Sequence, residues 1–495
     1  MPSIVLEELT IEEVHYHFIR GTCSAEALTE AYQERIQSLD RDEDGPRLNA
    51  TLAWNPEAVN DAKKLDDAFK AQRRFVGPLH GIPIVVKDTV QMSGLVTTFG
   101  SALAKGFVST EDSSVVKRLR DAGAIILAKT SMPDFGTDYF STSSLNGRVR
   151  NPYALDRDTG ASSSGTAAAI AANLAVVGLG SDAAGSIRLP ASMCNLVGLR
   201  PTVGLINTSG TLSGICGQST LGPMTRTVQD AAIMMDALID FDAAVYKPSG
   251  QCQPNLPVGG SFAAQLDSEK TPGLRLGVIR AFFGDDNDPE QHAVNEVINT
   301  TLEALQSAGC ELIDIDIPDL DTQLQSANVM LTRAKFDFNN FLTPTLGTSI
   351  DEIVKSGQFP KENVMLPYVA AQGPMCPHDS LEYGKQVDER ERLQCQVIAS
   401  KMNMTNISAL VFPTNKLPAP KYSDIDQAMR ANFPTNTRLA SILRLPAVTV
   451  PAGFTATTDL PVGLELVGLP FWDQHLLNIA YIVEQLVKAR RTPKL

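Results

Sequence analysis

The stretch "DTGASSSGTAAAIAANLAVVGLGSDAAGSIRLP", residues 158–190, decides the fold, because a hydroxyl-rich segment leads directly into helix and strand patterns. Seven serines and threonines lie among its glycines and alanines, and Asp182 and Arg188 are its only charges after the first residue. A flexible Gly/Ser linker would not continue into such order. Residues 167–175 predict a helix, and residues 176–180 predict a buried strand. Small hydroxyl side chains therefore lie beside unpaired backbone N–H groups, where a ligand can approach.

The composition is typical of a globular enzyme. The chain has 495 residues, 43% of them hydrophobic, and its net charge of −14 disfavours general binding to nucleic acid. We find no apolar core of a signal peptide and no run of about 18 apolar residues for a membrane span. The seven cysteines form no CxxC pair, which favours thiols in a reducing compartment. We expect a cytoplasmic protein without a nucleic-acid or membrane partner, and the composition is compatible with a homo-oligomer.

Helix and strand patterns alternate along the chain, which is typical of an α/β protein. Amphipathic patterns and capping signals predict helices within residues 6–40 (two helices), 56–71, 114–122, 288–308 and 473–490. Short apolar runs predict further strands at residues 82–86, 124–128, 274–279, 312–317, 410–412, 448–450 and 463–467.

No linker divides the chain, so we expect one domain over residues 1–495. Its expected parts are N-terminal helices (1–75), a core (76–320), a helical cover (320–435), and C-terminal strands with a helix (436–495). The cover is richer in Met, Pro and polar residues and carries no motif. We therefore expect it to determine substrate specificity.

Three familiar site patterns are disfavoured. Residues 178–183 fit the GxGxxA dinucleotide pattern, but Pro190 limits any following helix, and no acidic residue lies between Asp182 and Asp230 to bind a ribose. A Ser-His-Asp hydrolase lacks its GxSxG elbow, although a distant histidine remains open. The six histidines show no metal-ligand spacing. We expect neither a metal nor another cofactor.

Serine chemistry without histidine needs another base, because a serine hydroxyl is a weak nucleophile. Lys87 ends a β-branched run, and burial would lower its pKa and make its lone pair available. Alternation along a strand places Lys87 on the face of Val85 and sends Asp88 to the opposite face. From the residues alone, a buried base and a strand end emerging into solvent both remain open.

A turn of small residues follows the strand at 176–180. Its N–H groups, over Ala183–Ser186, can converge on one point and stabilise an oxyanion. Ser186 is then the candidate nucleophile. A plain tight turn would explain Gly185 but not the neighbouring hydroxyl-rich segment.

Taken in order, these motifs resemble those of the amidase signature family, from about residue 10 to about residue 485. The family's Gly-Gly-Ser-Ser-Gly-Gly-Ser and Asp-x-Gly-Gly-Ser-Ile-Arg segments correspond to GASSSGT at 160–166 and DAAGSIR at 182–188. Further matches lie at residues 81–88, 129–132, 149–152, 198–202, 222–226, 446–453 and 461–468. The resemblance implies an α/β fold with a large mixed β-sheet surrounded by α-helices.

The resemblance also implies a Ser–cis-Ser–Lys triad. Ser186 would attack a carbonyl, Ser162 would relay the proton after a cis peptide bond, and neutral Lys87 would accept it. Ser163 would hydrogen-bond within this network. The implied oxyanion donors are the backbone N–H groups of Ala183, Ala184, Gly185 and Ser186.

Four residues depart from the family pattern without removing a triad member. Ala161, Ser164 and Ala184 replace glycines, and Ser219 stands where many members carry Asp. A positive φ at Ala184 would cost about 1 kcal/mol or more. These departures concern the geometry on the substrate side.

The expected function is hydrolysis of a linear carboxylic amide through an acyl-enzyme on Ser186, with a small-molecule amide as partner. The same acylation would serve esters or carbamates. The alternatives are an A-type subunit of a glutamine-dependent amidotransferase, which releases ammonia for a partner, and a non-catalytic binding member of the fold.

Overall fold

A mixed β-sheet runs through the computed structural model, which describes residues 4–240, 260–269, 271, 273–372 and 376–495. Within these residues the order of its eleven strands is β1 (Thr51–Trp54), β3 (Ile125–Thr130), β2 (Pro83–Lys87), β6 (Val177–Asp182), β8 (Thr220–Thr225), β7 (Val197–Arg200), β12 (Ala447–Phe454), β13 (Pro461–Val467), β11 (Ala409–Pro413), β9 (Arg275–Val278) and β10 (Glu311–Asp314). β2 pairs in parallel with β3 and β6, and β9 pairs in parallel with β10 and β11. The other neighbours are antiparallel. The expected large mixed sheet is confirmed.

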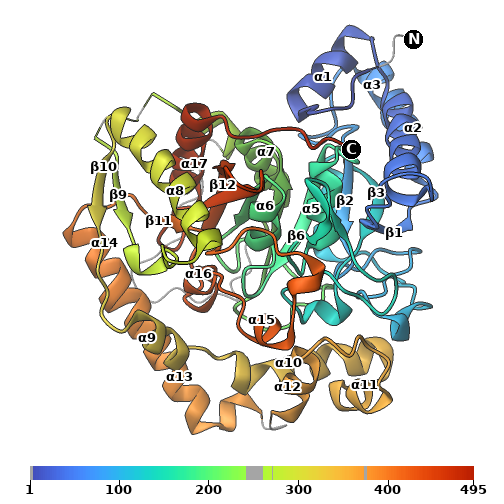
Figure 1. Cartoon of the computed structure of the whole chain (residues 1–495). Coiled ribbons are helices and arrows are strands. Elements are labelled where there is room, and N and C mark those ends of the chain that lie inside the picture. Colours follow the sequence, from blue (N-terminus) through green and yellow to red (C-terminus); the bar gives the residue numbers. More distant parts are fainter. Residues whose placement is uncertain (1–3, 241–259, 270, 272, 373–375) are drawn as a thin grey trace.

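Helices surround this sheet, and a small hairpin of β4 (Arg150–Asn151) and β5 (Ala154–Asp158) lies outside it. The helices are α1 (Ile11–Arg20), α2 (Ala25–Ile36), α3 (Ala58–Gln72), α4 (Ser114–Asp121), α5 (Ser164–Ala171), α6 (Arg188–Met193), α7 (Val228–Leu238), α8 (Pro289–Ser307), α9 (Leu320–Ser326), α10 (Met330–Leu346), α11 (Ile350–Ser356), α12 (Met365–Ala371), α13 (Leu381–Glu391), α14 (Ser400–Met404), α15 (Gln427–Ala431), α16 (Arg438–Ile442) and α17 (Asp473–Val487). Figure 1 shows α1–α3 at the β1–β3 end of the sheet, and α9–α14 as a curved outer band.

The predicted helices and strands are all present, with shifted bounds. α5 begins at Ser164, three residues before the predicted start. Gly165 lets its first turn approach a neighbouring segment closely, since a Cβ there would lie 2.2 Å from the Ala50 carbonyl oxygen. The expectation that Pro190 limits a helix was wrong in part, since α6 includes it. Proline is tolerated in a first turn, where its missing N–H would have no helical partner.

Strands β1, β7 and β8 and helix α7 were not predicted. β8 contains Gly222 and Pro223, which strands disfavour, yet it pairs with β6 on one side and β7 on the other. Such pairing between segments distant along the chain overrides local preference.

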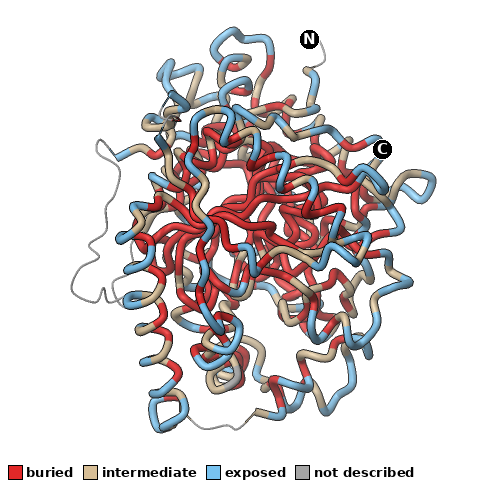
Figure 2. The backbone as a smooth tube through the Cα atoms, turned by 60° about the vertical axis from the view of Figure 1, so that its left-hand side comes forward, coloured by how far each residue is buried: buried red, intermediate tan, exposed pale blue. Residues whose placement is uncertain are grey.

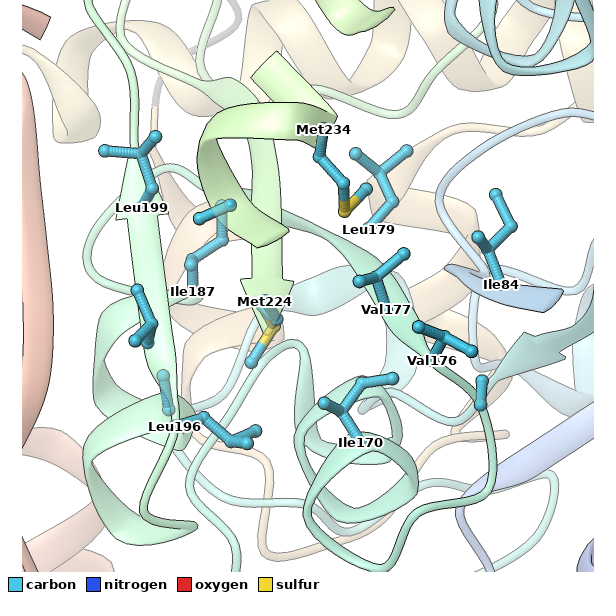
Figure 3. Close-up of a cluster of buried hydrophobic side chains, with 14 of the residues drawn as sticks. Ile84, Ile170, Val176, Val177, Leu179, Ile187, Leu196, Leu199, Met224 and Met234 are labelled. Carbon is cyan, nitrogen blue, oxygen red and sulfur yellow. The ribbon is translucent and has the colours of Figure 1, made fainter. Parts of the chain in front are cut away.

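An apolar core encloses the central strands, and the buried part of the chain is concentrated there (Figure 2). Figure 3 shows Met234 of α7 beside Leu179 of β6, and Ile170 of α5 and Met224 of β8 around the same strand. β2, which runs through this core, is buried along its whole length up to Lys87. Among the described residues, no helix combines the length and apolar character needed to cross a membrane.

Candidate active site

Lys87 and Ser162 meet where β2 ends and α5 begins. β2 and β6 are parallel neighbours, so their carboxyl ends lie at one edge of the sheet, next to the loop that precedes α5. The Lys87 Nζ atom is hydrogen-bonded to Ser162 Oγ at 2.6 Å and to Ser181 Oγ at 2.9 Å. The peptide bond between Ala161 and Ser162 is cis, as the resemblance implies. Sequence reasoning missed Ser181 as a lysine partner.

The Lys87 side chain is fully buried, which decides between the two interpretations left open above. Burial lowers the pKa of Lys87 to about 7, against the opposing charge of Asp182. Within the described residues no carboxylate pairs with Lys87. Asp88 lies on the other side of the strand, as alternation predicts, and pairs with Lys129 at 3.0 Å. Lys87 is therefore a buried amine among hydroxyls, not a solvated strand end.

Ser186 lies on the same cavity as Ser162 and is tied to the hydroxyl-rich loop through the main chain. The Ser163 N–H donates to the Ser186 carbonyl oxygen at 3.1 Å. Ser163 Oγ donates to the Ser181 carbonyl oxygen and accepts from the Ser181 N–H, both at 3.2 Å. Ser163 thus joins the two segments, while the Ser186 hydroxyl makes no hydrogen bond within the described residues.

The turn at Ala183–Ser186 differs in one donor from the expected oxyanion hole. The Gly185 N–H donates to Asp182 Oδ1 at 2.9 Å, so this donor is already used. The N–H groups of Ala183, Ala184 and Ser186 have no partner among the described residues, and all three residues line the cavity. In this structure the Gly185 N–H is therefore engaged by Asp182, and the role of the four N–H groups as oxyanion donors stays a prediction.

Gly185 is required in this turn, and Ala184 is tolerated. Gly185 has φ +111°, and a Cβ there would lie 2.1 Å from Thr437 Oγ1. Ala184 is not among the residues with positive φ, so the strain considered for it does not arise. Ala184 can therefore carry a side chain without backbone strain, whereas position 185 needs glycine.

A cluster of buried ion pairs around Asp182 lies next to the turn. Asp182 contacts Arg188 at 3.0 Å and Arg200 at 2.9 Å, and Arg188 also pairs with Glu465. Burial would raise the pKa of the Asp182 carboxyl, but the two guanidinium groups outweigh it and hold this pKa well below its usual range. Burial raises the pKa of Glu465 to about 7, although Arg188 opposes the shift. Asp182 thus remains an anion that fixes the turn.

The cavity over these residues has a volume of about 700 Å³ and a largely apolar wall. The helical cover contributes Met330, Ala334, Phe338, Met365, Tyr368 and Val369. Charged lining groups are few. Asp138 is neutralised by the buried Arg430 at 2.6 Å, and Arg438 is exposed. The site can therefore hold an uncharged apolar group beside the serines, with a wall built by the expected specificity region.

Comparison with known proteins identifies the family. Residues 27–477 match the family model described as Amidase. The A-type subunit of the glutamyl-tRNA(Gln) amidotransferase from Thermoanaerobacter pseudethanolicus is 30% identical over 511 residues, covering 99% of this chain and 98% of that protein. The corresponding protein of Symbiobacterium thermophilum is 31% identical over 500 residues, covering 95% of each. The native peptide amidase of Stenotrophomonas maltophilia has a TM-score of 0.86 at 30% identity, covering 99% of each chain.

The fold and the family model together define an amidase-family hydrolase. The chain belongs to the Amidase family, and its expected resemblance to that family is confirmed.

Proposed function

We propose that this protein hydrolyses a linear carboxylic amide through an acyl-enzyme on Ser186. The observation that carries the proposal is the 2.6 Å contact between Lys87 Nζ and Ser162 Oγ at a fully buried lysine without a carboxylate partner among the described residues. A lysine with a pKa of about 7 is neutral in an appreciable fraction of molecules near neutral pH and can accept a proton.

Acylation needs a net movement of one proton from Ser186 to Lys87 and of one proton back, each relayed by Ser162. As Ser186 Oγ bonds to the substrate carbonyl carbon, its proton passes to Ser162, and the proton of Ser162 passes to Lys87. The carbonyl oxygen becomes an oxyanion, for which Ala183, Ala184 and Ser186 offer N–H donors. Lys87 then returns a proton to Ser162, Ser162 passes one proton to the substrate nitrogen, the C–N bond breaks and the amine leaves. Water repeats the cycle on the acyl-enzyme and releases the acid.

The apolar wall of the cavity indicates the kind of acyl group. Met330, Phe338 and Tyr368 offer contact to an aliphatic or aromatic substrate. Esters of the same acids are expected to be cleaved as well, because their acylation uses the same nucleophile and oxyanion donors.

The test is a panel of small aliphatic, aromatic and peptide amides with an ammonia readout, combined with fluorophosphonate labelling. We expect the label on Ser186, and Ser186→Ala should lower turnover by at least about 10³-fold. Ser213, which lines the same cavity, is the control and should remain unlabelled. A label that maps to Ser213 would contradict the proposed nucleophile.

A second candidate is the A-type subunit of a glutamine-dependent amidotransferase, favoured by the names of the relatives that match nearly the whole chain. The same acylation would then release ammonia from glutamine for a partner protein. Strong glutaminase activity together with a co-purifying partner would favour this function. Turnover of apolar amides by the isolated chain, with little turnover of glutamine, would favour the amidase.

A further inference from the structure

Two side chains from distant segments hold carbonyl oxygens of the oxyanion turn. Gln218, just before β8, donates from Nε2 to the Ala183 carbonyl oxygen at 2.8 Å. Thr437, just before α16, donates from Oγ1 to the Ala184 carbonyl oxygen at 3.0 Å. Neither residue belongs to the motifs that define the triad.

The two outer peptide groups of the turn are held in the same way. Arg200 Nη1 donates to the Asp182 carbonyl oxygen at 2.7 Å. The Leu189 N–H donates to the Gly185 carbonyl oxygen at 2.8 Å. Every peptide group from residue 182 to residue 186 therefore has its carbonyl oxygen fixed by a donor.

Fixing a carbonyl oxygen also fixes the direction of an N–H group. In a trans peptide the C=O and N–H bonds of the planar unit point in opposite directions, and none of these peptide bonds is cis. Gln218, by holding the Ala183 carbonyl, therefore directs the Ala184 N–H away from itself. Thr437 likewise directs the Gly185 N–H, which meets Asp182 on the other side.

Gln218 is itself held rigidly. Its side chain is buried. Its main-chain N–H donates to the Ile215 carbonyl oxygen at 3.2 Å, and its main-chain carbonyl oxygen accepts from Arg200 at 2.6 Å. Because the amide faces a carbonyl oxygen, the donating nitrogen must lie on that side. The amide thus has one orientation toward the turn, while its Oε1 atom is buried without a partner among the described residues and the residue lines the cavity.

We propose that Gln218 and Thr437 are positioning residues of the oxyanion turn: Gln218 orients the Ala184 N–H, and Thr437 fixes the adjacent peptide group, whose N–H is bound by Asp182. This inference rests on the proposed function, because it assumes that the turn binds an oxyanion. Preorganised donors stabilise the charge that develops at the transition state more than they stabilise the substrate.

The test replaces Gln218 by methionine, which has a similar length but cannot donate. 3-Phenylpropanamide serves as substrate, 3-phenylpropanal as a probe that adds to Ser186 and places an oxygen anion in the turn, and 3-phenylpropanol as a probe that cannot. Gln218→Met should lower kcat about 30-fold and weaken aldehyde binding by a similar factor. Binding of the alcohol should change less than about twofold, because it does not use the oxyanion donors.

Gln474 provides a matched control. It lies on α17, and its Nε2 donates to the Phe262 carbonyl oxygen at 3.1 Å, the same chemistry away from the turn. Gln474→Met should leave kcat and both binding constants unchanged. A Gln218→Met variant with wild-type aldehyde affinity, or with equal losses for aldehyde and alcohol, would overturn the inference.

Thr437 gives an independent measurement, also if Gln218→Met does not fold. Thr437→Ser keeps the hydroxyl donor and should retain kcat, whereas Thr437→Val keeps the shape, removes the donor and should lower kcat and aldehyde affinity together. Equal activity of the two Thr437 variants would contradict the role.

If the wild-type protein forms no aldehyde adduct and turns over no amide, the proposed function has failed. If it does both and the variants behave like wild type, only this inference has failed.

Discussion

Lys87 and Lys129 are two fully buried lysines on neighbouring parallel strands, and they differ in their partners. Lys129 Nζ lies 3.0 Å from Asp88 Oδ1 and 3.1 Å from Thr97 Oγ1. Within the described part of the chain, Lys87 Nζ meets only oxygens of serines. Burial disfavours the charged form of both amines and lowers both pKa values.

The difference shows how one residue type serves two purposes in the same sheet. A carboxylate in contact favours the ammonium form, so Lys129 and Asp88 form an ion pair that supports the strands. Hydroxyl groups carry no charge and can accept or donate, so the neutral form of Lys87 remains accessible. Both lysines are buried, so it is the partner of the amine that makes Lys129 a structural ion-pair residue and Lys87 a candidate proton acceptor.

The largest effect should follow from removing the Lys87 amine. Lys87→Ala should lower kcat by at least about 10³-fold, close to the loss for Ser186→Ala, because the two residues act as one unit. Lys87→Arg should not restore activity, since a guanidinium stays protonated. Steady-state kinetics on the best amide of the panel measures both. Wild-type turnover of Lys87→Arg at neutral pH would make Lys87 a structural cation like Lys129.

For the free energy of unfolding, replacing Lys129 should have a larger effect than replacing Lys87, the opposite of their order for activity. Lys129→Met leaves the buried Asp88 carboxylate without its cation, so the free energy of unfolding should fall by about 3 kcal/mol. Lys87→Met breaks no ion pair, and its loss should be nearer to about 1 kcal/mol. Urea unfolding followed by circular dichroism measures both variants. Equal losses would show that the serine contacts of Lys87 stabilise the fold as much as the ion pair does.

The pH profile should reveal which lysine takes part in the reaction. Only neutral Lys87 accepts a proton, so with a pKa of about 7 the value of kcat/KM should rise about tenfold per pH unit well below pH 7 and level off above it. The profile should keep its midpoint in Lys129→Met. A profile that falls as pH rises through 7 would require a protonated group and would contradict the neutral base.

The smallest effect should come from the secondary contact of Lys87. Ser181→Ala removes the 2.9 Å hydrogen bond but leaves Ser162, so kcat/KM should fall about fivefold. Thr97→Val removes the corresponding hydroxyl contact of Lys129 and should leave kcat/KM unchanged. A larger loss for Thr97→Val than for Ser181→Ala would reverse the roles assigned to the two lysines.

Much of the site could be predicted from the sequence because its parts lie in short, distinctive segments. Lys87 ends a β-branched run, and Ser162 and Ser186 lie in the two hydroxyl-rich turns around one helix and one strand. Alternation along β2 also predicted that Asp88 points away from Lys87, and the structure pairs Asp88 with Lys129.

Other parts of the fold and the site had no local signal. β8 carries Gly222 and Pro223 and forms a strand only because β6 and β7 pair with it. The carboxylate that raises the pKa of Lys87 against the effect of burial is that of Asp182, which lies 95 positions further along the chain. Periodicity and propensity describe neighbours along the chain and contain no information about such approaches.

The sequence by itself determined the α/β class, because strand and helix periodicity are local properties. Its motifs also carried the resemblance to the amidase signature family, and that resemblance implied the residues of the expected triad. Only the tertiary structure decided that Lys87 is buried among hydroxyls, that Asp182 takes the Gly185 N–H, and that Gln218 and Thr437 hold the oxyanion turn. These features depend on desolvation and on hydrogen bonds between segments up to about 250 residues apart, which exist only after the sheet has assembled.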